Sequence, residues 1–376
     1  MIYLDNAATT GTKPKSVINA VNYALENLSA NPGRGSYERS NKAAMSVFEC
    51  RKTIKDFVGA ESENNVCFTL NCTQAINMVL QGTLKSGDHV IISSLEHNAV
   101  VRPVYGMFSE NGVEYSIAEV SEDDDKTVEN FKNLIKDNTK MIFVTAASNV
   151  TGKTLPVFKL GILCKERGIL FGVDGAQAVG ILPVDMDKMN IDYLCIAPHK
   201  GFYAPMGSGV LVAKKSIEKV LIKGGTGVNS LEVTQPEELP ERVESGTVNL
   251  PGIFGVLAGV NFVKNRGLES IYKHEINLCQ YCYDELSKIG AELYTKRPEN
   301  LKTAPVISFN FAGKNSIFVA KKLAENNIAV RSGLHCAPLA HKQIKTLLTG
   351  TVRVSPSVFN TKADIDALIF TLKRVI

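Results

Sequence analysis

Short apolar runs alternate with longer amphipathic stretches through the first half of the chain. The apolar runs are typical of buried strands and cover residues 66–70, 90–92, 141–146, 169–173 and 193–197. Between and before them, helical periodicity predicts helices at residues 14–28, 37–57 and 75–80. This alternation predicts an α/β fold in which a mainly parallel sheet is covered by helices on both sides.

The pattern changes after Gly209, where helical stretches dominate. Helices are predicted at residues 253–263 and 271–289. The remaining apolar runs are short and predict strands at residues 306–309, 328–330 and 351–354. This part of the chain is typical of a smaller α+β domain that follows the large one.

A polar side chain follows each of the five predicted strands of the first half. In chain order these side chains belong to Thr73, His97, Asn149, Asp174 and Lys200. Any one of them could be only a helix cap or a turn residue. Ligands of parallel sheets bind beyond the carboxyl ends of the strands, however, and capping alone does not explain five such residues at one edge. The sequence therefore predicts a binding site at this edge.

Lys200 closes the segment Ala197-Pro198-His199-Lys200-Gly201, directly after an apolar run. A lysine at the end of a buried strand is costly unless it has a partner or a function. In one interpretation its side chain reaches along the apolar surface to solvent. In the other, desolvation removes its proton and leaves a nucleophilic amine, which is the usual route to a Schiff base. The other four strand ends favour the second interpretation.

Three of the strand-end groups fit the requirements of pyridoxal phosphate. This cofactor needs a lysine for its aldehyde, an anion site for its phosphate and a carboxylate that keeps its pyridine nitrogen protonated. Lys200, the helix start at Thr73 and Asp174 supply these groups. The sequence therefore predicts pyridoxal phosphate as the cofactor.

Further polar residues could complete such a site. His97 could stack on the cofactor ring, and Asn149 or Gln177 could hydrogen-bond its phenolic oxygen. An amino-acid substrate also needs a partner for its carboxylate, and arginine binds carboxylates with a bidentate fork. Arg331 and Arg353 are the candidates for this role. The alternative for each arginine is a surface ion pair.

Cys336 lies beside His335 in a loop that a glycine precedes. A free thiol has a pKa of about 8.5, so only a few per cent is thiolate at neutral pH unless a neighbour takes the proton. Cys336 could be an inert small side chain or a nucleophile. With His335 and His341 it could also form part of a metal site, but such a site would need a further ligand. We predict no metal.

Composition and charge exclude several classes of protein. The 42 basic and 38 acidic residues leave a net charge of +4 and no basic run, which does not favour nucleic-acid binding. No apolar run approaches the roughly 20 residues of a membrane span, and the start of the chain does not resemble a signal peptide. The eight cysteines are scattered, as in a reduced cytoplasmic protein. Cys279 and Cys282 are interpreted as buried helix residues rather than a redox or metal pair.

Motifs along the whole chain resemble those of class V (fold type I) aminotransferases, and among them the NifS/SufS-like cysteine desulfurases. The Arg-x-Gly-x-His-Cys-Ala motif in particular resembles the SufS-like group with a short catalytic loop. The pieces that carry the resemblance are Tyr3-Leu4-Asp5-Asn6-Ala7-Ala8-Thr9, Thr73-Gln74-Ala75-Ile76-Asn77, Glu96-His97, Ser148-Asn149-Val150-Thr151-Gly152, Val173-Asp174-Gly175-Ala176-Gln177, His199-Lys200, Gly246-Thr247, Arg331-Ser332-Gly333-Leu334-His335-Cys336-Ala337 and Arg353 with Asn360-Thr361.

The resemblance implies an architecture and a cofactor site. Residues 16–254 would form a large domain around a mainly parallel sheet of the seven-stranded type. Residues 1–15 and 255–376 would form the smaller domain, which carries the cysteine loop. Thr247 would reach the cofactor phosphate from the other subunit of a homodimer. The implied cofactor-binding residues are Cys72, Thr73, His97, Asn149, Asp174, Gln177, His199, Lys200 and Thr247.

The resemblance also implies an activity and the residues that carry it. Lys200 would hold the cofactor as a Schiff base and later move protons, while His97 stacks on the ring. Cys336 would take the sulfur of L-cysteine as a persulfide, leave L-alanine, and pass the sulfur to an acceptor protein or a reductant. The implied substrate-binding residues are Ala8, Asn149, Arg331 and Arg353.

Four positions depart from the family pattern. Ala197 stands where a phosphate-binding Ser or Thr is usual, Pro198 where Gly is frequent, and Cys72 where Thr or Ser is usual. A lost hydrogen bond to a charged group costs about 1.5–3 kcal/mol, which a covalently held cofactor tolerates. Leu334 replaces the first of two histidines that often precede the cysteine of the SufS-like motif.

Three hypotheses follow from the sequence. The first is a cysteine desulfurase that supplies sulfur to Fe–S clusters or other biomolecules. The second is another class V enzyme, such as a selenocysteine lyase, a transaminase or a β-lyase, in which Cys336 is incidental. The third is a non-catalytic scaffold with the same fold, for which only Ala197 and Pro198 speak.

Overall fold

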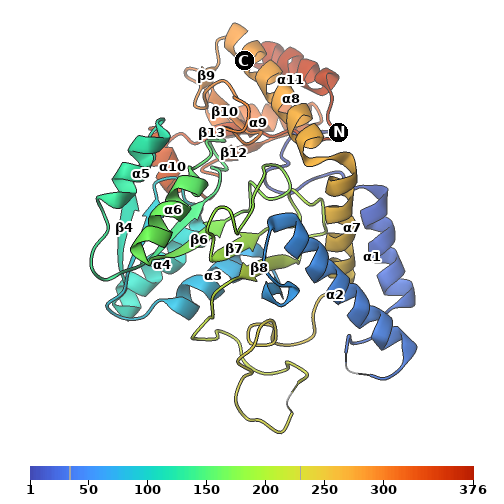
Figure 1. The fold of residues 1–376 in the computed structure, drawn as a ribbon. Helices are drawn as coiled ribbons and strands as arrows, with labels where there is room; N and C mark the ends of the chain where they lie inside the picture. Colours follow the sequence, from blue (N-terminus) through green and yellow to red (C-terminus); the bar gives the residue numbers. More distant parts are fainter. Residues whose placement is uncertain (34, 229) are drawn as a thin grey trace.

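A seven-stranded sheet lies between layers of helices at the centre of the molecule (Figure 1), a computed structural model that describes residues 1–33, 35–228 and 230–376. Every neighbouring pair from β7 to β4 is parallel, and β8 is antiparallel to both its neighbours. The expected α/β fold with a mainly parallel seven-stranded sheet is confirmed. The spatial strand order is β2 (Val66–Thr69), β8 (Gly209–Ala213), β7 (Tyr193–Ile196), β6 (Leu170–Asp174), β5 (Thr139–Thr145), β3 (His89–Ser93) and β4 (Glu114–Ala118).

The apolar runs form strands because both faces of the sheet are buried. Along β2, Val66 and Phe68 belong to one hydrophobic core and Cys67 to the other, as the period-two alternation of a strand requires. Helices that contribute to the first core include α2 (Glu38–Val58), α6 (Val157–Arg167) and α7 (Leu250–Arg266). Those of the second core are α3 (Cys72–Thr83) and α4 (Asn98–Asn111).

Two strands of this sheet were not predicted. β4 is an edge strand in which only Ala118 is buried, so it lacks a continuous apolar run. β8 is buried throughout, but it directly follows the Gly207–Gly209 turn, where the sequence pattern indicated a change of domain. The sheet therefore extends past the predicted end of the strand series.

The first turn of α3 corrects one prediction. Thr73 was considered as the N-cap of this helix, but the N-cap is Asn71, whose side chain accepts a hydrogen bond from the Gln74 N–H at 2.9 Å. Thr73 lies within the first helical turn, where its side chain is free to serve a ligand rather than the cap. The other helices of this part are α1 (Lys15–Asn27), the short η1 (Glu63–Asn65) and α5 (Asp124–Lys132).

The C-terminal part forms a second layer above the large sheet, seen at the top of Figure 1. It contains an antiparallel sheet in the order β12 (Arg331–Gly333), β13 (Thr351–Val354), β10 (Ile307–Asn310) and β9 (Glu292–Leu293). The sequence predicted β10 and β13 but not β12, which is only three residues long. The helices of this part are α8 (Leu268–Lys288), α9 (Ser316–Glu325), α10 (Pro338–Gln343) and α11 (Lys362–Val375).

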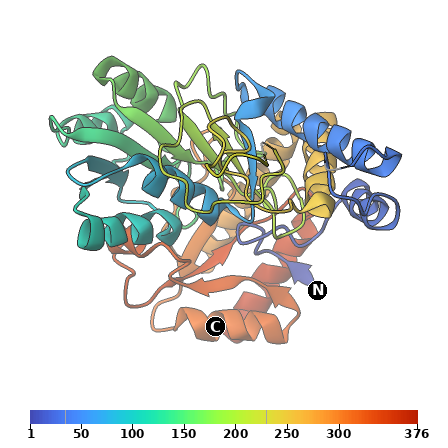
Figure 2. The same cartoon turned by 90° about the horizontal axis from the view of Figure 1, so that it is seen from below.

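The two ends of the chain meet in this upper part. β1 (Ile2–Tyr3) pairs in parallel with β11 (Ile328–Ala329), and both termini lie beside the small sheet in Figures 1 and 2. We propose the division into residues 16–254 and residues 1–15 with 255–376, although residue 254 falls within α7, which packs against α1 and α2. Cys279 and Cys282 are buried in α8, as predicted.

None of the helices in the described ranges is long and apolar enough to cross a membrane.

Candidate active site

A cavity of about 210 Å³ opens at the carboxyl ends of the parallel strands. Most of the predicted site residues line this one cavity: Ala8, Cys72, Thr73, His97, Asn149, Asp174, Gln177, His199, Lys200, Arg331 and Arg353.

Lys200 is held in a tight turn that follows β7. Its N–H donates to the Ala197 carbonyl at 3.0 Å, and its own carbonyl accepts from the Tyr203 N–H at 2.9 Å. Burial is the main cause that lowers the pKa of the Lys200 amine, and the nearby Asp174 carboxylate opposes the shift. The amine is therefore easier to deprotonate than that of an exposed lysine, as a Schiff-base lysine requires.

Asp174 ends β6 and is almost completely buried. Its Oδ1 atom accepts a hydrogen bond from the Ala176 N–H at 2.9 Å and another from the Cys72 thiol at 3.6 Å. Burial and the Asp174 carboxylate raise the pKa of Cys72 well above its usual value. Cys72 is thus a neutral hydrogen-bond donor to Asp174. The cysteine that stands where Thr or Ser is usual therefore has a hydrogen-bond partner within the site.

Two histidines of the cavity are neutral. His97 is the N-cap of α4, and its Nδ1 atom accepts from the Ala99 N–H at 3.0 Å, which leaves the proton on Nε2. Burial lowers the pKa of His97, and it lowers that of His199 to about 4. The buried Nδ1 atom of His199 has no hydrogen-bond partner within the described part of the chain. A neutral His199 that carries its proton on Nδ1 could donate a hydrogen bond from this atom to a phosphate oxygen.

Arg353 is fully buried in β13, so the surface ion pair considered from the sequence is wrong for this residue. Its Nη2 atom donates to Asp5 Oδ1 at 2.6 Å, and its Nη1 atom donates to the Asn149 carbonyl at 3.0 Å. Burial lowers the pKa of Arg353, while the Asp5 carboxylate opposes that shift. The guanidinium is therefore fixed in place at the wall of the cavity, as the binding of a substrate carboxylate requires.

Cys336 lies at the exposed end of a loop beside the cavity, and its Sγ atom is 3.3 Å from Nη2 of Arg331. His335 and Cys336 have left-handed φ angles of 49° and 59°, which are unusual for residues with side chains. Two contacts from the loop after β5 and from the start of α4 hold this backbone: Asn149 Nδ2 donates to the His335 carbonyl at 2.7 Å, and the Asn98 N–H donates to the Cys336 carbonyl at 2.7 Å.

The two histidines of the C-terminal loop face each other rather than Cys336. The rings of His335 and His341 lie 5.5 Å apart, and each is bound to a threonine, Thr351 and Thr346 respectively. Burial lowers their pKa values to about 2 and about 4. Among the residues that the structure describes, no group of three or more metal-ligating side chains includes them. Their arrangement is that of a buried structural pair.

Asn149 lines the cavity, but its amide nitrogen donates to the His335 carbonyl, which leaves its side-chain oxygen to face a ligand. Thr247 does not line the cavity of Lys200; it lines a separate one with Gln74 and Ser208. The prediction that Thr247 serves the partner subunit stays a prediction.

Sequence reasoning did not name several residues of this region as site residues. The cavity is also lined by Ala7, Asn71, Ile76, Ala99, Thr145 and Ala176, and Asp5 holds Arg353. Asn71 follows β2 and Thr145 ends β5, so these two positions carried a usable signal. The pairing of Asp5 with Arg353 joins opposite ends of the chain, and no local pattern indicates it.

The comparisons with known proteins agree with this geometry. The sequence model of the family described as Aminotransferase class-V matches residues 2–368. The chain belongs to the class-V aminotransferase family. A protein from Pyrococcus abyssi named probable cysteine desulfurase is 34% identical over 386 residues, with 100% of this chain and 94% of that protein covered. A cysteine desulfurase from Haloferax volcanii is 30% identical, with 98% and 88% covered.

Solved structures support the same assignment to the class-V aminotransferases. The apo structure of a cysteine desulfurase from Thermococcus onnurineus matches with a TM-score of 0.92 at 31% identity, covering 100% of this chain and 94% of that one. The cysteine desulfurase CsdA from Escherichia coli matches with a TM-score of 0.87 at 26% identity, covering 99% and 94%. The chain is therefore an enzyme of the NifS/SufS-like, fold type I group.

Class-V aminotransferases depend on pyridoxal phosphate, and the residues of the cavity fit that group. The fit rests on the lowered pKa of Lys200, the buried Asp174 and the start of α3. It also rests on the buried His199 Nδ1 atom, which lacks a partner within the described residues.

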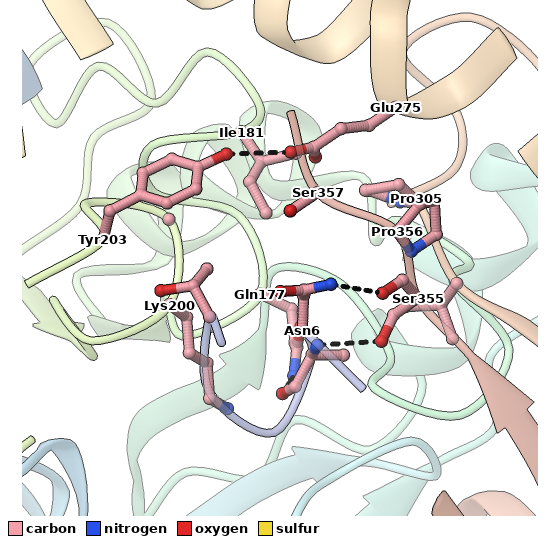
Figure 3. A pocket seen from close by; sticks show the side chains of 14 residues that line it. Asn6, Gln177, Ile181, Lys200, Tyr203, Glu275, Pro305, Ser355, Pro356 and Ser357 are labelled. Carbon is pink, nitrogen blue, oxygen red and sulfur yellow. Dashed lines mark hydrogen bonds between the residues drawn. The ribbon is translucent and has the colours of Figure 1, made fainter. Parts of the chain in front are cut away.

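A second, smaller cavity lies behind Lys200 in this class-V aminotransferase (Figure 3). Its lining includes Lys200, Tyr203 and Glu275, a buried residue of α8. The Tyr203 hydroxyl donates to Glu275 Oε1 at 3.0 Å, so the C-terminal part is bonded to the turn that carries Lys200. Burial raises the pKa of Glu275 to about 8, and the same cause raises that of Glu96, next to His97, to about 8.

We expect these two acids to make the protein less stable as the pH rises. A carboxyl group with a folded-state pKa of about 8 and an ordinary value of 4.5 holds its proton in the folded state while the unfolded chain releases it. The free energy of unfolding should therefore fall between about pH 4.5 and pH 8. Glu275→Gln should flatten this fall by on the order of 2–4 kcal/mol between urea denaturations at pH 5 and pH 8. Equal pH slopes for Glu275→Gln and the wild type would contradict the neutral-acid assignment.

Arg353→Lys is expected to weaken both the fold and substrate binding. A lysine cannot bond Asp5 and a second carboxylate in the same plane, and breaking a buried ion pair costs about 3–5 kcal/mol. The KM for an amino-acid substrate should rise at least ~10-fold, measured with the cofactor-loaded enzyme. Asp5→Asn is the matched control, because it removes the same ion pair but keeps the guanidinium, so its KM should rise less than that of Arg353→Lys. An unchanged KM for Arg353→Lys would contradict a role of Arg353 in substrate binding.

Proposed function

We propose that this enzyme is a cysteine desulfurase, which takes the sulfur of L-cysteine onto Cys336 and releases L-alanine. The observation that carries the proposal is the contact of Cys336 with Arg331 at 3.3 Å, because Arg331 also lines the cavity of Lys200. Cys336 is exposed, whereas the other seven cysteines are buried. A sulfur acceptor needs such a thiol, reachable both from the cavity and from solvent.

The cofactor-binding residues divide by the part of pyridoxal phosphate that each would hold. Lys200 would bind its aldehyde and Asp174 its pyridine nitrogen. The start of α3 with Thr73, together with His199, would bind its phosphate. When bound, the cofactor withdraws electrons from the carbon atoms of an attached amino acid. The remaining proposed contacts are the stacking of His97, the phenolic contacts of Asn149 and Gln177, and those of Cys72 and of Thr247 from a partner subunit.

The residues around the substrate control its orientation and its protons. Arg353 and Arg331 would bind the substrate carboxylate, beside Ala8 and the free oxygen of Asn149. Lys200, whose pKa burial lowers, would take and return the proton on the substrate α-carbon. Cys336 would then approach the substrate sulfur from the side of the loop.

The sulfur-transfer step is balanced without an external oxidant. The Cys336 sulfur bonds to the sulfur of L-cysteine while the carbon–sulfur bond of the substrate breaks. The electron pair of that bond stays with the carbon and takes up a proton, which gives L-alanine. Arg331, whose Nη2 atom lies 3.3 Å from Sγ, would donate a hydrogen bond to the attacking sulfur.

The proposal includes the surroundings in which the enzyme works. We propose a homodimer in the cytoplasm, in which Thr247 of each subunit completes the other subunit's site. The persulfide sulfur would pass to an acceptor protein or a reductant, for use in Fe–S cluster assembly or other sulfur-containing products. Neither a nucleic acid nor a membrane is part of the proposed function.

A product assay with two substrates tests the proposal against its alternative. The cofactor-loaded enzyme is given L-cysteine and L-selenocysteine in parallel, and alanine is measured while the visible spectrum is recorded. A cysteine desulfurase should release alanine from L-cysteine at a rate that depends on Cys336. Alanine from L-selenocysteine alone would instead identify a selenocysteine lyase, and a colourless protein without either activity would identify a scaffold.

A further inference from the structure

A long stretch around Cys336 contains no acidic residue. Glu325 is the last acid before it and Asp364 the first one after it. Within residues 326–363 the charged side chains are all basic: Arg331, Lys342, Lys345, Arg353 and Lys362. The whole chain has 42 basic and 38 acidic residues, so the segment around Cys336 carries a local excess of positive charge.

Residues 337–350 leave the chain after Cys336, form a compact loop, and return beside Gly333 at the start of β13. We call this loop the excursion. It contains α10 and is closed by the His341–Thr346 hydrogen bond of 2.7 Å. Gly350 packs so closely against Gly333 that a Cβ atom on Gly350 would lie 2.7 Å from the Gly333 backbone. The C-terminal end of the excursion is therefore held beside Gly333, three residues before Cys336.

The excursion and the segment before Cys336 expose both apolar and basic side chains. Leu334, two residues before Cys336, is 38% exposed, and within the excursion Leu347 is 43% and Leu348 100% exposed. Lys342 and Lys345 of the excursion are exposed as well, and neither forms an ion pair with any residue that the structure describes. We refer to these five residues as the Cys336 shoulder. Exposed apolar side chains that gather into a patch mark interaction sites.

We infer that the Cys336 shoulder docks the sulfur acceptor, and that this acceptor is an acidic protein segment with a cysteine flanked by apolar residues. The inference rests on the proposed function, which supplies the persulfide. Negative charge on the acceptor complements Lys342 and Lys345 and speeds the encounter, while the leucines provide the apolar contact.

The transfer that this docking serves is balanced. The acceptor thiolate attacks the outer sulfur of the Cys336 persulfide and forms a new sulfur–sulfur bond. The bond between the two enzyme-held sulfurs breaks, and the electron pair leaves with the Cys336 sulfur as a thiolate. The proton of the acceptor thiol goes to this thiolate or to solvent, so no oxidant or reductant is consumed.

Three synthetic peptides test the inference. Each has a central cysteine between two leucines, and the flanking residues are aspartates, serines or lysines. The cofactor-loaded enzyme is first given L-cysteine, the persulfide on Cys336 is verified by mass spectrometry, and the rate of its transfer to each peptide is then measured. We expect the acidic peptide to react at least ~10-fold faster than the basic one at low salt, and the difference to shrink at high ionic strength.

Variants assign this preference to the shoulder. Lys342→Glu with Lys345→Glu should abolish or reverse the preference for the acidic peptide, and Leu348→Ser should slow all three peptides. Alanine production with dithiothreitol as the reductant should stay at the wild-type level in both variants. The matched control is Lys132→Glu with Lys165→Glu, which makes the same charge change on α5 and α6 and should preserve the preference.

The outcomes separate this inference from the proposed function. Equal rates for the three peptides, or the same loss of preference in the control variant, would overturn the docking surface while the persulfide itself is still observed. If the wild-type enzyme carries no persulfide before any peptide is added, the proposed function fails, and the docking inference fails with it.

Discussion

Lys200→Ala is expected to abolish both the covalent attachment of pyridoxal phosphate and the release of alanine from L-cysteine. Burial lowers the pKa of the Lys200 amine, and no other described lysine lines the cavity, so none can replace it. The loss of a covalent and proton-moving group should reduce the rate by at least ~10²–10⁴-fold. The visible absorbance of the cofactor-loaded protein should shift to that of unattached cofactor.

An exposed lysine near the end of β8 provides the control for this prediction. Lys215→Ala removes a lysine of the same chain on the surface, and it should leave both the absorbance and the rate at the wild-type level. Borohydride reduction followed by peptide mapping identifies the attached residue directly. A reduced adduct on a lysine other than Lys200 would contradict the assignment.

Cys336→Ala is the second substitution for which we expect a large effect. It should reduce alanine release from L-cysteine by at least ~10²-fold with a protein or thiol acceptor present, because no other described thiol is exposed. The cofactor absorbance should not change, since Cys336 lies in the loop beside the cavity and not among the residues that line it.

The buried cysteines provide the control for Cys336→Ala. Cys164→Ala, in α6, removes one thiol without touching the cavity and should keep most of the activity. If Cys336→Ala is as active as the wild type while a physiological acceptor is present, the sulfur-transfer role of Cys336 fails.

Much of the site could be predicted from the sequence because its geometry follows from the sheet. The ends of parallel strands share one edge, so reading the polar residue after each apolar run placed Thr73, His97, Asn149, Asp174 and Lys200 together. The helix start needed the structure, since Asn71 and Thr73 are both good capping residues and only the backbone shows which one caps α3.

The contacts that sequence reasoning missed are those between distant parts of the chain. Arg353 bonds Asp5, Cys336 bonds Asn98 through its carbonyl, and Glu275 bonds Tyr203. The Asp5–Arg353 pair forms within the smaller part, between the two ends of the chain, and the other two pairs depend on how that part packs on the large one. Local periodicity carries no information about either kind of packing. Glu275 in particular occupies a helix whose pattern does not indicate which of its polar residues is buried.

The most direct measurement of the central claim is a mass-spectrometric map of all eight cysteines after the cofactor-loaded enzyme has reacted with L-cysteine in the absence of an acceptor. Alanine is quantified in the same sample. The account predicts one added sulfur atom on Cys336, in about a one-to-one ratio with alanine, and no added sulfur on the buried cysteines. Alanine released without sulfur on Cys336, or sulfur found on a different cysteine, would contradict it.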